Sequence, residues 1–254
     1  MSPVEIIAIV LAGVAAGTIN TVVGSGTLIT FPTLLAIGVP PVTANVSNTI
    51  GLVPGSVSGA IGYRAELAGQ KRRALWLIPA SAIGAIAGAV LLLVLPSEAF
   101  SAIVPVLIVL GCVLVVVGPR ISAAVARRHA DRGGLPDRGA WWTQPLVGLT
   151  GVYGGYFGAA QGIILLAVMG IGIDDELQRL NALKNVLAGV ANGVSGLLFV
   201  VVADVDWLIV LLIAIGSTVG GQIGSRYGRR LPATALRVFI VAVGLVALAV
   251  FLAG

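Results

Sequence analysis

Long apolar runs separated by short charged islands dominate this chain. Residues 75–95, 103–117 and 238–252 are almost entirely apolar, unlike the alternating apolar and polar pattern of a membrane β-barrel strand. A run of about 20 mostly apolar residues is long enough to cross a bilayer as a helix. The pattern therefore predicts an all-α polytopic membrane protein with about 8 to 10 membrane segments.

The positions of the charged residues predict the orientation of the chain. Basic residues gather in 64–73, 120–138 and 226–237, and the short connections between these islands carry only acids, such as Glu98 and Asp206. Lysine and arginine mark the cytoplasmic side of a membrane protein. The alternation therefore predicts that both termini are extracellular.

The alternation also divides the chain into two similar halves. We expect a first membrane repeat over 1–119, a basic cytoplasmic linker over 120–141 and a second membrane repeat over 142–254. Because the first repeat starts outside and the second starts inside, the sequence predicts an inverted-topology repeat, which is typical of secondary transporters.

Each half is expected to contain five segments. It opens with a broken or re-entrant helical hairpin, at 4–39 in the first half and at 142–173 in the second. A long helix follows, which in the first half covers 42–62, and two further helices complete the repeat. Pro54 is expected to kink the first long helix.

Composition supports a membrane protein and narrows the chemistry. Of the 254 residues, 58% are hydrophobic and 10% are charged, whereas soluble domains carry about a quarter charged residues. With a single cysteine and a single histidine, the chain has no internal disulfide and no ligand set for zinc or haem, so we expect no cofactor. The residue sets of intramembrane enzymes are also missing, which indicates that the protein is not an enzyme.

Each hairpin contains a polar, glycine-rich interruption within apolar sequence, at 20–27 and at 153–162. Backbone leaves helical pairing inside a bilayer only where protein or a water-filled cavity satisfies it, and free amides at a helix N-terminus favour an anion. In the alternative interpretation, the glycines only allow close helix packing. The hairpin residues expected at a binding site are Asn20, Thr21, Gly24, Ser25, Gly26, Thr27, Tyr153, Tyr156 and Gln161.

The helix after each hairpin carries polar residues at helical spacing, which places them on one face pointing away from lipid. An ionisable residue within a span usually faces the bundle interior and has a function, so Lys184 is expected to supply positive charge for an anion. The alternative is that its amine reaches cytoplasmic water along the helix. The candidates from these helices are Asn45, Asn48, Asn181, Lys184, Asn185 and Asn192.

No carboxylate lies within a predicted span, which argues against a cation pump. The net charge of +5 comes from loops that set the topology, so it does not indicate nucleic-acid binding.

These motifs resemble those of the TauE/SafE sulfite exporter family, also called the toluene sulfonate uptake permease family, over nearly the whole chain. In the first half the resemblance is carried by residues 13–27, 31–32 and 38–40. In the second half it is carried by residues 151–158, by Asn181, Lys184 and Asn185, and by residues 205–207. One departure is Ser25, where many relatives have a third glycine.

The resemblance implies a multi-pass permease or exporter in the plasma membrane of a prokaryote. It would move small sulfur-containing anions, such as sulfite or organosulfonates, and alternating access between the two halves is the leading hypothesis. Its partners would be the small anionic substrate and the lipid bilayer, and the sequence leaves room for a homo-oligomer. The alternatives are an anion channel, a transporter of another small organic anion and a non-transporting interaction protein.

Overall fold

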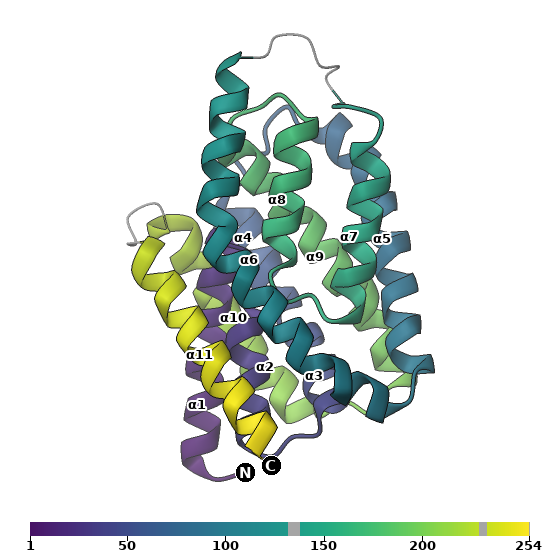
Figure 1. The fold of residues 1–254 in the computed structure, drawn as a ribbon, viewed down its shortest axis with the longest axis vertical. Coiled ribbons are helices and arrows are strands. Elements are labelled where there is room, and N and C mark those ends of the chain that lie inside the picture. The colour runs from purple at the N-terminus through teal and green to yellow at the C-terminus, as the bar shows by residue number, and fades with distance from the viewer. Residues whose placement is uncertain (132–137, 229–232, 254) are drawn as a thin grey trace.

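The computed structural model describes residues 1–131, 138–228 and 233–253, and the regular elements of these residues are helices (Figure 1). In chain order they are α1 (Pro3–Val22), α2 (Thr27–Ala36), α3 (Pro41–Gly51), α4 (Val53–Gly62), α5 (Lys71–Val94), α6 (Ser97–Asp131), α7 (Thr143–Tyr156), α8 (Gln161–Gly172), α9 (Leu177–Val202), α10 (Trp207–Tyr227) and α11 (Ala233–Ala253).

Five helices of the described residues are long and apolar enough to cross a membrane: α1, α5, α6 over Ser97–Ala124, α9 and α10. Shorter apolar helices are α2, α8 and the part of α11 over Arg237–Val246. Large apolar side chains such as Leu11, Ile83 and Val201 are exposed on the outside of the molecule, where a bilayer would cover them. The predicted all-helical polytopic membrane protein is confirmed, and the number of crossings stays a prediction.

The two interrupted hairpins enter from opposite ends of the molecule and meet inside it. The start of α1 and the end of α11 lie at one end in Figure 1, and the loop from α8 to α9 lies at the other. The first hairpin turns over residues 23–26 and the second over 157–160. At the contact between the two turns, Gly162 N donates a hydrogen bond of 3.0 Å to Gly24 O.

The first hairpin packs against α10 and the second against α5, and both contacts use glycines four residues apart. A Cβ atom on Gly17 of α1 would overlap the backbone of Ser217 on α10, and one on Gly151 of α7 would lie 2.6 Å from Ser81 O on α5. Small residues let helix backbones approach closely. The glycine pairs 13 and 17, 216 and 220, 84 and 88, and 151 and 155 therefore hold each hairpin on a long helix of the other half.

The long helix expected over 42–62, with a kink at Pro54, is divided into two short helices. The chain forms α3 and α4, which are separated at Leu52. Pro54 has no N–H to donate to Ile50 O, whereas Leu52 N donates to Asn48 O at 2.9 Å and Ser56 N donates to Leu52 O at 3.0 Å. The expected kink at Pro54 is therefore a break between two short helices.

The linker predicted over 120–141 begins inside a helix, which corrects its boundary. α6 has 35 residues and continues to Asp131, which makes it about 52 Å long. The end of α6 is rich in alanine and arginine, and both residues favour a helix. Its charged residues are unfavourable in the bilayer core, so the helix continues outside the core. Residues 132–137 of the predicted linker lie outside the described residues.

Asp175, in the loop from α8 to α9, joins the beginnings of α5 and α9. Its carboxylate lies 2.5 Å from Arg73 Nη1 and 2.8 Å from Arg179 Nε, with side chains that are 12%, 13% and 30% exposed for Arg73, Asp175 and Arg179. Burial raises the pKa of the Asp175 carboxyl, but hydrogen bonds from Arg73 and the Glu176 backbone, with the charges of both arginines, hold that pKa below its ordinary value.

We therefore predict that Asp175→Asn lowers the free energy of unfolding by about 1 to 3 kcal/mol, because two partly buried arginines lose a charged partner that they share. The stabilisation is present above the unfolded-state pKa of about 3.9 and is lost as the pH falls through the lower folded-state pKa. Thermal unfolding of detergent-purified protein should show a difference in Tm that shrinks below about pH 4. Glu176→Gln removes an exposed neighbouring charge and should leave Tm unchanged; an equal loss in both variants would contradict the prediction.

Candidate functional site

The last carbonyls of α1 lie inside the molecule and need hydrogen-bond donors, because a helix end leaves its final carbonyl groups without intrahelical partners. Lys184 of α9 provides two donors: its Nζ lies 3.0 Å from Asn20 O and 3.2 Å from Thr21 O. The Nδ2 atoms of Asn181 and Asn185 each donate to Thr21 O at 3.3 Å. The structure thus brings together five candidates from the two halves of the chain.

Lys184 is 1% exposed, and its amine points to the end of α1. This geometry does not fit the alternative in which the amine reaches cytoplasmic water along its own helix. A cation at the C-terminal end of a helix is stabilised by the helix dipole. The second hairpin also contacts the lysine, since a Cβ atom on Gly162 would lie 3.0 Å from Lys184 Cδ.

Two glycines of the first turn are required by its geometry. Gly24 has a φ of +89°, and a Cβ atom on it would overlap Gly162 Cα. A Cβ atom on Gly26 would overlap the carbonyl of Ala16, and Gly26 N donates to Asn20 Oδ1 at 3.3 Å. Both glycines therefore allow close packing, which is the role that the alternative interpretation assigned to them. A contact between these glycines and substrate stays a proposal.

A second polar cluster joins α2 to α3. Asn48 Nδ2 lies 3.5 Å from Thr27 Oγ1, and Thr30 Oγ1 donates a short hydrogen bond to Asn48 Oδ1. Thr30 was not among the sequence candidates. Its spacing of three residues from Thr27 places both on one helix face, which is the signal that could have found it.

Asn45 forms the counterpart, in the other half, of the contact made by Asn181. Asn45 Nδ2 donates to Tyr156 O in the last turn of α7 at 2.9 Å, as Asn181 Nδ2 donates to Thr21 O in the last turn of α1. The Oδ1 atoms of both asparagines are buried without a hydrogen-bond partner. Other buried polar atoms of this region that lack a partner are Ser25 Oγ and Tyr156 OH.

The remaining candidates brace the second turn or lie apart from both turns. Tyr153 OH donates to Ala159 O at 2.5 Å, and Gln161 Nε2 lies 3.5 Å from Thr150 O. Asn192 is buried on α9 about two turns beyond Asn185 and takes no part in the bonds described above.

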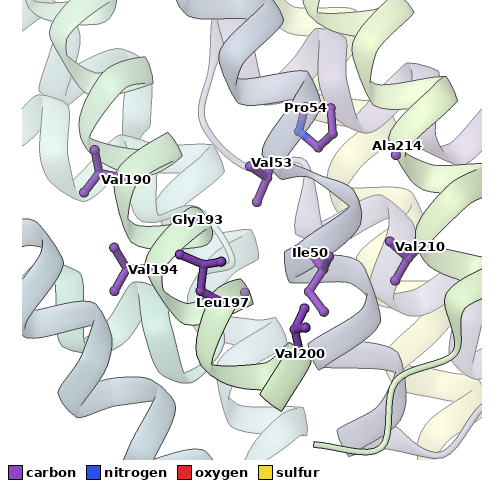
Figure 2. Close-up of a pocket in the computed structure, with 11 residues that line it drawn as sticks. Ile50, Val53, Pro54, Val190, Gly193, Val194, Leu197, Val200, Val210 and Ala214 are labelled. Atoms are coloured by element: carbon purple, nitrogen blue, oxygen red, sulfur yellow. The ribbon is translucent and has the colours of Figure 1, made fainter. Parts of the chain in front are cut away.

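Two spaces near these clusters differ in chemistry. A groove of about 590 Å³ runs between α3, α4, α9 and α10, and Figure 2 shows its apolar lining, which includes Ile50, Val53 and Leu197. Such a surface suits lipid and provides no donor for an anion. A smaller cavity of about 110 Å³ has a mixed lining, which joins the polar residues Tyr63, Ser122, Gln178 and Asn181 to Val22, Leu166, Leu177 and Gly228.

The chemistry of the turns suits an anion. The cation of Lys184 is bonded to two neutral carbonyls, and the amides of Asn181 and Asn185 donate to one of these carbonyls. Within the described ranges, no group of three or more His, Cys, Asp or Glu residues could hold a metal ion.

Comparison with known proteins agrees with a transporter. The family model "Sulfite exporter TauE/SafE" matches residues 9–252. The chain is 28% identical over 239 residues to "Probable membrane transporter protein ORF9" of Sinorhizobium sp, covering 92% of this chain and 87% of the relative. It is 25% identical over 230 residues to "Probable membrane transporter protein YfcA" of Escherichia coli strain K12, covering 89% and 81%. No solved structure matches the chain significantly.

A third relative, a "Probable membrane transporter protein" of Haemophilus influenzae, is 24% identical over 244 residues, which cover 94% of this chain and 91% of the relative. The family match and these relatives each extend over most of the chain. The protein is a multi-pass membrane transporter and not an enzyme, and it belongs to the sulfite exporter TauE/SafE family.

Proposed function

We propose that this protein transports small sulfur-containing anions, such as sulfite or organosulfonates, by alternating access around Lys184. One observation carries the proposal: a buried ammonium lies where the turns of two broken hairpins meet. An ammonium has three N–H donors, and Asn20 O and Thr21 O accept two of them. The third is available to an anion, which needs a fixed positive charge to offset the hydration that it loses on entering the protein.

The groups around the lysine would complete the anion site. The amides of Asn181 and Asn185 lie beside it, and the buried Ser25 Oγ lacks a partner. In the proposed mechanism, the substrate accepts hydrogen bonds from some of the groups that now donate to the last carbonyls of α1. The amide and hydroxyl candidates of the first half would contact the substrate as the hairpins move.

The proposed mechanism requires the two halves to be inverted repeats, and the helix packing supports this. The contact of α1 with α10 corresponds to that of α7 with α5, and the contact of α2 with α11 to that of α8 with α6. The hairpins start from opposite ends of the molecule (Figure 1). We infer that the site lies near the bilayer midplane, as in other transporters built from inverted repeats.

We propose a plasma-membrane orientation in which the basic loops face the cytoplasm. Arg64 and Arg226 lie at the ends of α4 and α10, and Lys71 and Arg179 lie at the starts of α5 and α9. The starts of α5 and α9 are at the end of the molecule opposite the start of α1 (Figure 1). A homo-oligomer stays a prediction from the sequence alone.

This orientation predicts that a reporter active only in the cytoplasm is silent when fused after Gly254. The same reporter fused after Gly228, at the end of α10, should be active because the basic loop there faces inward. Measurement of reporter activity in intact cells checks both fusions. Strong activity of the fusion after Gly254 would overturn the orientation.

For the site, we predict that Lys184→Gln weakens sulfite binding about tenfold or more, because a hydrogen bond to a charged group contributes about 1.5 to 3 kcal/mol. Lys184→Arg should retain part of the affinity, since it keeps the charge. Calorimetry on purified protein, with sulfite, thiosulfate, sulfonates and carboxylates as ligands, measures the effect and ranks the substrates.

Lys71→Gln is the matched control, because it removes the same charge from an exposed position at the start of α5. It should bind sulfite as the unaltered protein does. A folded Lys184→Gln variant with unchanged affinity would contradict the proposed site, and a conductance driven by voltage in liposomes would show a channel instead of a carrier.

A further inference from the structure

The polar cavity of about 110 Å³ lies between the two halves of the chain. Tyr63 and Val22, near the ends of α4 and α1, and Ser122 of α6 contribute from the first half, and Gln178 and Asn181 from the start of α9. The basic loops begin beside these helix ends. A space of this size holds about four water molecules at liquid density, so the cavity is large enough for water and for a small ion that has shed most of its hydration.

Asn181 connects this cavity to the buried lysine. Its Nδ2 donates to Thr21 O, which also accepts from Lys184 Nζ, while its Oδ1 has no partner although the residue is 6% exposed. A buried amide oxygen without a hydrogen-bond donor is destabilising. Asn181 therefore stands between the cavity and the ammonium of Lys184.

The other side of the hairpin turns is filled by aromatic rings. Phe31 of α2 lies 5.1 Å from Phe157 and 6.4 Å from Phe100, and Phe100 lies 5.7 Å from Tyr156, measured between ring centroids in edge-on geometry. These four side chains are at most 8% exposed. Close-packed rings exclude water from this side of the site.

The two ends of the site therefore make similar hydrogen bonds but differ in packing. Asn45 bonds Tyr156 O of the aromatic cluster, as Asn181 bonds Thr21 O beside the polar cavity, and both have an unpaired Oδ1. The counterpart of the cavity beside Asn181 is thus a packed cluster beside Asn45.

We propose that the cavity at Ser122 and Asn181 is the open vestibule through which anions reach Lys184 from the side of the basic loops. The cluster of Phe31, Phe100, Tyr156 and Phe157 is the closed vestibule of the opposite side. This assignment rests on the proposed function. When the protein opens to the other side, the rings separate, Asn45 gains water and the cavity at Ser122 closes.

The single native cysteine makes a direct test simple. Starting from Cys112→Ser, one variant carries Ser122→Cys in the cavity and another carries Val104→Cys, which is buried on the same helix one turn beyond Phe100. The probe is the anionic, membrane-impermeant reagent sulfonatoethyl methanethiosulfonate, applied to sealed vesicles of either orientation. We expect the cysteine at 122 to react only from the side of the basic loops, about tenfold or more faster than the one at 104.

Reaction of the cysteine at 104 from the opposite side, or no reaction at 122, would overturn the assignment. Adding Phe31→Ala to Val104→Cys should open the aromatic cluster and make that cysteine reactive from the side of the termini; continued protection would show that the cluster is not the closure. This labelling pattern does not require transport, so it separates failure of the vestibule from failure of the proposed function.

A transport assay then distinguishes a vestibule on the substrate path from a position that the reagent reaches but the substrate does not use. Modification at 122 should block sulfite uptake into liposomes, whereas Arg127→Cys, an exposed position on α6 beyond its membrane span, should react and still allow uptake. Unchanged uptake after modification at 122 would exclude the cavity from the path.

Discussion

A helix that ends inside the protein leaves carbonyl groups that need donors other than bulk water, and this constraint organises the centre of the molecule. α1 ends at Val22, and the last carbonyls before that end accept from Lys184, Asn181 and Asn185. These three residues can donate to the same helix end because steps of three and four residues place them on one face of α9. The glycine contact at Gly24 and Gly162 brings the second turn against the same point.

The same donors are suited to an anion, and this links stability to the proposed transport. Lys184 is held by neutral carbonyls and not by a carboxylate, so an anion competes with weak acceptors for its charge. A substrate that binds these donors would loosen the first hairpin from α9. Rigid packing of each hairpin on α10 or α5 would then carry that local change to a whole half of the molecule.

The sequence predicts much of this arrangement because membrane helices obey strong local rules. Hydropathy locates α5 and α10, and the glycine-rich interruptions locate both hairpin turns. It cannot predict that Thr21 O gathers three donors or that Asn45 reaches Tyr156 O, because these contacts join residues more than 100 positions apart. The extension of α6 was missed because charge ends a membrane span but does not end a helix.

The central claim is that an anion binds between the hairpin turns at Lys184, and anomalous diffraction tests it most directly. Selenite has the shape and charge of sulfite, and selenium gives its own signal in crystals soaked with it. The account predicts a selenium peak about 4 Å from Lys184 Nζ, the separation that a charge-assisted hydrogen bond through a selenite oxygen requires. A peak found only at the basic loops, with none beside Lys184, would contradict it.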